Sequence, residues 1–464
     1  MLKKLKIHIK AVLIAAVLMQ AAPAAWADMS ESELRLRAME EKWMDRIDKL
    51  EKKYEALSKK ESKGLPGVPY DSRGVKKQGG IRIKHDKKGF HFETPDGIFS
   101  THLLWRAQMR YSSLTGSSSP VTLSDFNKED SNNFELRRVR MKIGGHGYRP
   151  WIKYYFEVDL QPSRTVDKSS SKASSRLIDY RITLQPLEQI GLRIGQWKIN
   201  YNRERVDSSG RQQFVERSIV NRVFAVDRQI GAMLKGHLFK GTFADMRYYG
   251  GVFNGEGRSV NNSDNNVMLM GRLQWNFLGR DLKWRQSDVS YHKKPAASLA
   301  FAAVTTQGRC TRWSSSGCGH LDGFEIGDPN QFRIDQQVQE FALKYKGLSV
   351  QEEFHWKNIT DRKNHVDHNL RGSYAEAGYF LNGLIPQIPK NIELAARYAF
   401  VDQPDNSNVL LTNNREEYSA VLNYFIAGHN NKITLDYSYL TLDDASSGRS
   451  ASNNRIRLQW DVSF

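Results

Sequence analysis

Residues 454–464 read NRIRLQWDVSF, and this stretch decides the fold class of the chain. Its apolar side chains are Ile456, Leu458, Trp460, Val462 and Phe464, and the positions between them include Arg455, Arg457, Gln459 and Asp461. Successive side chains of a β-strand point to opposite faces. The stretch therefore predicts a strand with one apolar face and one charged face.

The same alternation recurs earlier in the chain. It is found in residues 134–145, 152–160, 269–277, 392–400 and 432–439. These segments are about ten residues long, which is the length that a tilted strand needs to cross a bilayer, and Tyr and Trp gather near their ends, as in interfacial girdles. A soluble sandwich also alternates, with its apolar face inward, but the export signal described below favours the membrane. We expect an all-β fold, a transmembrane antiparallel β-barrel. If each strand with its connection takes about 25 residues, the barrel has about 16 strands.

The composition agrees with a barrel and excludes other classes of protein. The 464 residues include 69 Lys and Arg against 51 Asp and Glu, a formal charge of +18, and the mean hydropathy is −0.60. A membrane helix needs roughly 20 consecutive apolar residues, which the sequence does not contain. Aromatic residues, at 11%, are too frequent for a disordered chain. The charge points to nucleic acid, an anionic membrane or anionic solutes as partners.

Residues 1–27 predict a secretory signal peptide. Four lysines precede a mostly apolar run, and Ala25-Trp26-Ala27 reads as a small-x-small cleavage site. An uncleaved membrane anchor is the alternative, but the apolar run is shorter than a span. Cleavage removes four positive charges and leaves +14, and export argues against nucleic acid as a partner.

Two cysteines, Cys310 and Cys318, lie in the Gly- and Ser-rich stretch GRCTRWSSSGCGH. In an oxidising compartment we expect them to form a disulfide that closes a small loop. A metal site is the weaker interpretation, because two Cys and the nearby His320 fall short of a structural zinc set. We expect neither a metal nor a cofactor.

Residues 28–62 predict a short coiled-coil helix. Leu36, Trp43, Leu50 and Leu57 recur every seventh residue, which is the spacing of a coiled-coil seam. A coiled coil this short is marginal alone, so a single amphipathic helix on the barrel, or a disordered segment, is the alternative. Residues 63–80 contain Gly and Pro without periodicity and predict a linker. The barrel then occupies residues 81–464.

Several strings in their order resemble the phosphate-selective porin O and P family of Gram-negative outer membranes. They are FELRRVRMKIGG (134–145), RLIDYRITL (176–184), GLRIGQWKINYNRE (191–204), DSSGRQQFVERS (207–218) and DRQIGAMLKGHL (227–238), followed by SYAEAGYFL (373–381), NIELAARYAFVD (391–402) and the ending QWDVSF. The resemblance covers about residues 130–464. It implies a sixteen-stranded barrel, usually trimeric, in the cell outer membrane. It also implies a third extracellular loop that folds into the lumen, and conduction of phosphate or polyphosphate along Arg and Lys ladders.

Two groups of cations are candidates for an anion pathway. Arg138, Arg140 and Lys142 share one face of a strand, about 6.6 Å apart. The second group follows the GQWK string, at the place that the resemblance gives to the inward-folding loop: Arg203, Arg205, Arg211, Arg217, Arg222 and Arg228. Lys198, the last residue of the GQWK string itself, is a further candidate. Arg suits oxyanions because its planar fork donates to two oxygens at once. The alternative is that these cations brace the wall, since the loop also holds Glu204, Asp207, Glu216 and Asp227.

We therefore expect a passive outer-membrane porin for small anions such as phosphate, a homotrimer in contact with outer-membrane lipid. A general diffusion porin, or an envelope protein whose N-terminal helix tethers the barrel in the periplasm, is the alternative. An enzyme is not expected, because the sequence has no GxSxG, no HExxH and no Ser/His/Asp grouping at recognisable spacing.

Overall fold

The computed structural model describes residues 80–464 except 87–88, 118–119, 162–175, 263, 315–316, 403–412 and 445–446. The predicted signal peptide, the predicted coiled-coil helix and all but the last residue of the predicted linker lie outside the described residues. No helix among the described residues is long and apolar enough to cross a membrane.

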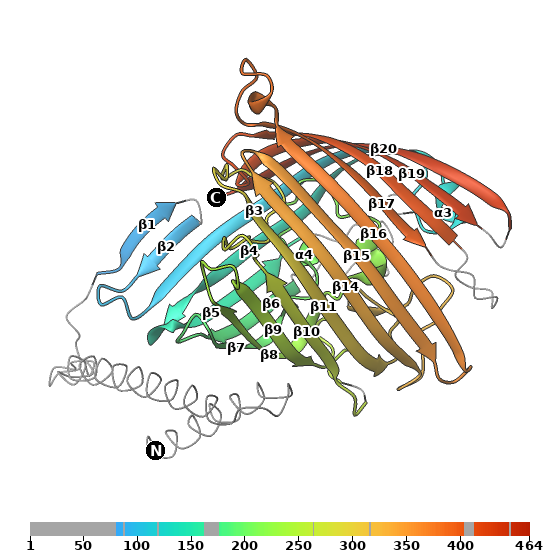
Figure 1. Ribbon diagram of the computed structural model, residues 1–464, viewed down its shortest axis with the longest axis horizontal. Coiled ribbons are helices and arrows are strands. Elements are labelled where there is room, and N and C mark those ends of the chain that lie inside the picture. The colour runs from blue at the N-terminus through green and yellow to red at the C-terminus, as the bar shows by residue number, and fades with distance from the viewer. Residues whose placement is uncertain are drawn as a thin grey trace, which may run out of the picture. The chain divides into compact units, whose positions relative to one another are not determined.

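Within the described residues, eighteen strands form one antiparallel sheet, and sixteen of them close into a barrel (Figure 1). The first two, β1 (Arg82–Asp86) and β2 (Gly89–Glu93), form a hairpin beside the barrel wall. The barrel strands are β3 (Ser100–Leu114), β4 (Ser131–Gly147), β5 (Arg149–Asp159), β6 (Arg176–Leu184), β7 (Gly191–Lys198), β8 (Arg228–Leu238), β9 (Met246–Phe253), β10 (Met268–Trp275), β11 (Ala296–Gly308), β14 (Phe332–Tyr345), β15 (Leu348–Asp361), β16 (Val366–Phe380), β17 (Ile392–Asp402), β18 (Asn413–Phe425), β19 (Asn431–Asp444) and β20 (Arg449–Ser463). The predicted strand number is confirmed.

The barrel closes between its first and last strands. Residues 106–114 of β3 pair with residues 455–463 of β20, and the backbones of Trp105 and Phe464 exchange two hydrogen bonds of 2.8 and 3.1 Å. Residues 100–103 of β3 pair with β2. Among the strands that the structure describes, closure leaves no long unpaired edge. A sheet within a bilayer cannot tolerate such an edge.

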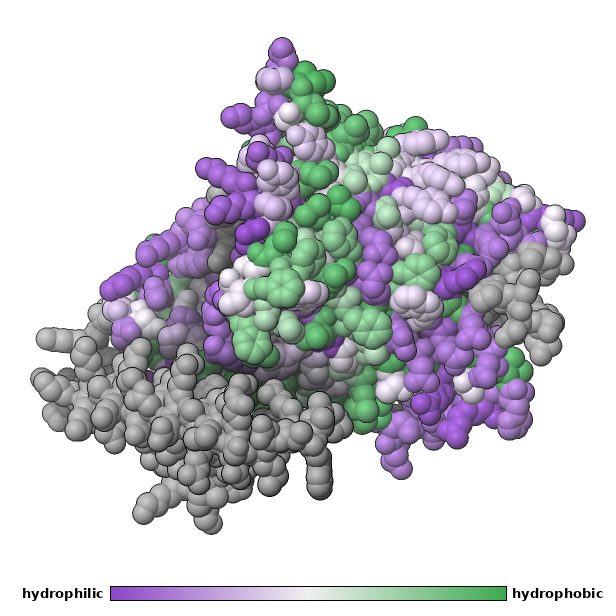
Figure 2. Space-filling model, viewed as in Figure 1, coloured by the Kyte–Doolittle hydropathy of each residue, from purple (hydrophilic) through white to green (hydrophobic). Residues whose placement is uncertain are grey.

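The alternation of the C-terminal strand has the sense expected of a membrane barrel. Ile456 and Leu458 on the outer face are 49% and 47% exposed, whereas Arg457 and Gln459 on the inner face are 3% and 2% exposed. A soluble sandwich would bury the apolar set instead. Figure 2 shows hydrophobic side chains gathered over the outer face of the strands and hydrophilic ones towards the ends. The charged face therefore lines the lumen.

The connections differ at the two ends of the barrel. We call the end that holds the first residue of β3 and the last residue of β20 the turn end, and most connections there are short. For example, a two-residue turn joins β14 to β15, and its residues Lys346 and Gly347 both have positive φ (46° and 85°). The opposite end, the loop end, has long connections at residues 115–130, 199–227, 254–267 and 309–331. One connection departs from this pattern, because residues 276–295 form a long segment at the turn end.

Short elements lie within these connections. They are α3 (Leu123–Phe126), α4 (Arg203–Val206), α5 (Val220–Phe224), the hairpin of β12 (Arg312–Ser314) and β13 (Gly317–Gly319), and the 3₁₀ turn η1 (Leu381–Gly383). Two of them, α4 and α5, belong to residues 199–227, which we call the inward loop. The apolar side chains of α5 are buried against the inner wall in the main hydrophobic cluster of the chain.

Candidate functional site

The inward loop crosses the lumen and is bound to the far wall through carboxylates. Glu340 of β14 accepts a 2.9 Å hydrogen bond from the backbone N–H of Arg203, and Glu353 of β15 accepts one of 2.6 Å from that of Glu204. Glu417 of β18 likewise accepts from the N–H of Ile219 at 2.9 Å. The carboxylates of the far wall thus satisfy backbone donors of a buried loop, which would otherwise be costly.

Further acids of the same wall serve the same purpose. Glu393 of β17 accepts from the Gln213 side chain at 2.7 Å, and Asp436 of β19 accepts from the N–H of Val215 at 3.4 Å. Five inward-facing acids of β14–β19 therefore contact the loop, and a neighbouring cation, Arg397, lies 2.6 Å from one of them, Glu417. We call this side of the lumen the acidic wall.

The opposite side, formed by β3–β8, is rich in cations and faces a cavity. This turn-end cavity has a volume of about 400 Å³ and is lined by β3–β8, the inward loop and residues 284–285. Its cations are Arg140, Lys142, Arg181, Arg193, Lys198, Arg211, Arg228 and Arg285, against the carboxylates Glu157 and Asp179. Cations outnumber acids, so the lining of the cavity carries a net positive charge.

Half of these cations are paired and half are not. Arg140 lies 3.0 Å from Glu157, and Arg228 lies 2.5 Å from Asp179. In contrast, four cations of the cavity make no ion pair with a described residue: Lys142, Arg193, Lys198 and Arg211. Burial and the nearby Arg285 lower the pKa of Arg211 to about 10, so this guanidinium still carries its charge at neutral pH.

A second cavity, of about 660 Å³, lies towards the loop end. It is lined by Arg110, Arg137, Arg138, Arg205, Arg217, Arg222, Arg312, Arg415, Arg455 and Arg457, with Glu135, Glu216 and Glu417 among the acids. Glu216 of the inward loop is the centre of this set, because Arg110, Arg137 and Arg138 all lie within 2.7–3.2 Å of its carboxylate. These three guanidinium groups hold the pKa of Glu216 well below its ordinary value despite burial.

The stripe predicted on β4 joins the two cavities. Arg138 lines the loop-end cavity, whereas Arg140 and Lys142 line the turn-end cavity. Same-face neighbours of a strand stand about 6.6 Å apart. The stripe therefore places cations at one such spacing from one cavity to the other.

The remaining predicted cations divide between the cavities. Arg205, Arg217 and Arg222 line the loop-end cavity, and Lys198, Arg211 and Arg228 line the turn-end cavity. Arg203 lines neither: it is 1% exposed, and its Nη1 donates a 2.8 Å hydrogen bond to the backbone oxygen of Lys283. A role of these residues in an anion pathway stays a prediction.

Sequence reasoning missed two features. One is the acidic wall, whose residues are far apart in sequence and share only the inward parity of their strands. The other is the segment of residues 276–295, in which Leu282, Gln286, Ser287 and Asp288 are buried inside the barrel. The one sequence signal for this segment is that it is a long connection at the end of the barrel where most connections are short. That signal can be used only when the strands have been counted securely.

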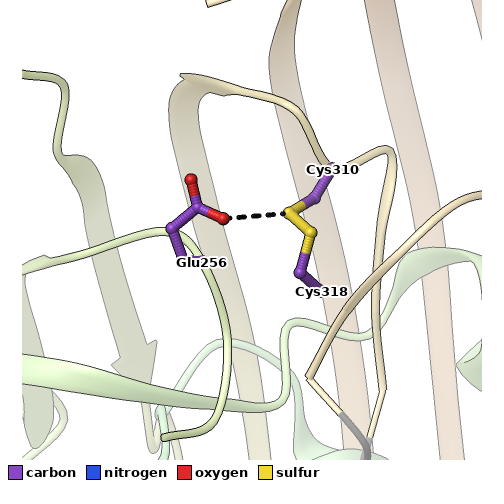
Figure 3. A group of neighbouring side chains, drawn as sticks. All are labelled: Glu256, Cys310 and Cys318. Carbon is purple, nitrogen blue, oxygen red and sulfur yellow. Dashed lines mark hydrogen bonds between the residues drawn. A yellow bond between two sulfur atoms is a disulfide. The ribbon is translucent and has the colours of Figure 1, made fainter. Parts of the chain in front are cut away.

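The disulfide lies beside the loop-end cavity. Cys310 and Cys318 are joined, and Glu256 Oε2 lies 3.6 Å from Cys310 Sγ (Figure 3). These three residues are the one group among the described residues whose ligand atoms are close enough to hold a metal ion. Because both sulfur atoms are bonded to each other, neither is a thiolate ligand.

Comparison with known proteins agrees with the geometry. The outer membrane channel DcaP of Acinetobacter baumannii superposes on this chain with a TM-score of 0.52 at 12% identity, over 80% of this chain and 99% of that chain. An anion-selective porin from Comamonas acidovorans gives a TM-score of 0.48 at 10% identity, over 79% of this chain and all of its own. No curated protein matches the sequence.

The profile of the phosphate-selective porin O and P family matches residues 121–295 and 328–464, more than half of the chain. The DcaP likeness supports the same barrel fold. The chain belongs to the phosphate-selective porin O and P family and is an outer-membrane porin.

Proposed function

We propose that this porin conducts small anions along the basic wall formed by β3–β8. The observation that supports this most strongly is the division of the lumen: the acids of β14–β19 bind the inward loop, whereas Lys142, Arg193, Lys198 and Arg211 face the turn-end cavity without an ion pair to a described residue. Several cations in series bind an anion well enough to admit it and weakly enough to release it.

Reversal potentials in planar bilayers test the proposal. Across a KCl gradient, we expect a reversal potential that favours chloride over potassium. Lys142→Gln and Arg193→Gln should each reduce that preference, because each removes an unpaired charge from the cavity. Lys240→Gln is the matched control, since Lys240 is an exposed residue at the turn end, paired with Glu188. A wild-type preference for potassium would refute the proposal.

Phosphate is the anion that we propose as preferred. The support is the number of guanidinium groups along the path, since each can donate to two oxygens of one oxyanion. Millimolar phosphate should then reduce the chloride current of single channels, and less so in Arg140→Gln. Unchanged chloride current would refute phosphate preference while leaving the anion pathway intact.

We propose that the porin is a homotrimer. The family resemblance implies this state, and the heptad positions Leu36, Trp43, Leu50 and Leu57 provide a seam for three chains. The mass of the purified protein in detergent, with and without residues 28–62, tests the proposal. A monomeric mass for the full-length chain would refute it.

A further inference from the structure

We propose that residues 276–295 form a second constriction element, which enters the lumen from the turn end and is latched to the inward loop by the ion pair of Asp207 with Arg285. We call these residues the turn-end segment and the ion pair the latch. The inference rests on the proposed function, because it names the residues that set the width of the same anion pathway.

The turn-end segment is fixed to the wall at both sides of its tip. At one side, Arg247 of β9 makes two contacts of 2.6 Å with the Asp281 carboxylate. At the other, Lys344 of β14 donates to the Ser287 backbone oxygen at 3.0 Å, and Asp288 accepts from the N–H of Gly347 at 3.0 Å. Residues 282–287 between these anchors are therefore held inside the barrel.

The tip of the turn-end segment touches the inward loop directly. Arg203 donates to the Lys283 backbone oxygen at 2.8 Å, and the N–H of Gln213 donates to the Gln286 side chain at 2.6 Å. The Trp284 ring lies against two guanidinium groups, with Arg203 and Arg272 Cζ at 5.5 and 4.8 Å from the ring centroid. Such cation–π contacts stabilise by about 0.5–2 kcal/mol each, so Trp284 wedges the tip in place.

Asp207 is the point at which the two elements and the two cavities meet. Its carboxylate pairs with Arg285. Its backbone oxygen accepts a 2.6 Å hydrogen bond from Arg217, which lines the loop-end cavity, and one of 3.4 Å from Lys198, which lines the turn-end cavity. Asp207 itself is 1% exposed. Cations from both sides and from the turn-end segment thus converge on one residue of the inward loop.

Trp284 and Arg285 also line the turn-end cavity, together with Arg140 and Lys142 of β4. The basic wall and the latched segment therefore both bound this cavity. An anion that passes through this cavity moves between the wall cations and Arg285. The position of Arg285, and with it the cross-section of the path, depends on Asp207.

Single-channel recording of Asp207→Asn and Arg285→Gln tests the latch. Either substitution frees the tip of the turn-end segment, so we expect a conductance increase of roughly twofold with added current noise, since the narrowest section limits a wet pore. Asp207→Asn should keep the anion preference, whereas Arg285→Gln should weaken it. The double variant should have the same conductance as Arg285→Gln, because both substitutions remove the same ion pair. Asp328→Asn, which breaks an exposed pair with Lys363, is the matched control.

A reversible cross-link gives an independent measurement. In a Cys310→Ser, Cys318→Ser background, Asp207→Cys and Arg285→Cys joined by a cleavable thiol-reactive cross-linker as long as the lost ion pair should conduct like that background, and more after the linker is cleaved. Arg285 is 33% exposed in its side chain, so Arg285→Gln decides the question if Asp207→Asn does not fold. Unchanged conductance in folded Arg285→Gln overturns the latch even where the wild type prefers anions. A wild type without anion preference refutes the proposed function, and the conductance of the variants still reports on the latch.

Discussion

Glu216 shows how a single acid of the inward loop controls several cations. Three arginines converge on it, and they keep its pKa low, so it stays ionised at all physiological pH values. Glu216→Gln should release positive charge into the loop-end cavity and increase the anion preference in reversal-potential measurements. It should also lower the free energy of unfolding by roughly 1–3 kcal/mol, since the buried guanidinium groups lose a charged acceptor. An anion preference that falls in this variant would contradict the assignment.

Glu204 provides a pH-dependent contact in the same loop. Burial raises the pKa of Glu204 to about 7, although Arg397 lies 3.8 Å away, because Glu353 adds repulsion. Its oxygens accept from the N–H and hydroxyl of Ser218 at 2.7 and 3.0 Å. A carboxyl with a raised pKa binds its proton more tightly in the folded state, so its contribution to stability is lost as the pH rises from about 4.5 to about 7.

The thermal midpoint of the wild type should therefore fall between pH 5 and pH 8 relative to that of Glu204→Gln. Other groups titrate in both proteins and cancel in this difference. Equal pH dependence in the two proteins would show that Glu204 is ionised throughout this range.

At the scale of the element, the hairpin of β12 and β13 is held by a disulfide bond, so its stability depends on a covalent link. Cys310 and Cys318 close a short loop with a sequence separation of 8, and the buried Trp313 between them donates to the Gly255 backbone oxygen at 2.6 Å. Removing the bond in Cys310→Ser with Cys318→Ser should lower the free energy of unfolding by about 2–3 kcal/mol through loop entropy. Thermal unfolding of the wild type, with and without reductant, and of the variant measures this loss of stability. The prediction would be contradicted if reductant did not change the unfolding of the wild type and the variant unfolded at the same temperature.

The elements also show what could be predicted from the sequence. The strand at Arg449–Ser463 was predictable, because a repeat of two places every second side chain on one face and the period is local. The turn-end segment was not predictable, since its contacts are to Asp207, Gln213 and Glu393, which are distant in sequence. Its polar side chains follow no period, so only the closed barrel reveals that they point inward.

At the scale of the whole molecule, the net charge conceals a division across the lumen. The charge of +18 belongs to a chain in which the acids of β14–β19 bind the inward loop, leaving the cations of β3–β8 to face the cavities. The alternation predicted that the charged side chains would face the lumen. That acids of β14–β19 would bind the inward loop was not predictable, because it depends on which strands lie opposite the loop.

This division predicts that anion preference depends on ionic strength. Unpaired cations act through a field that salt screens, and the Debye length falls from about 10 Å at 0.1 M to about 3 Å at 1 M. The chloride-to-potassium permeability ratio should therefore decline as KCl rises from 0.1 to 1 M, and the decline should be smaller in Lys142→Gln, which has less unpaired charge to screen. The Lys240→Gln control should follow the wild type. A ratio that stays constant with salt would mean that direct contacts at the constriction, rather than the field of the basic wall, select the anion.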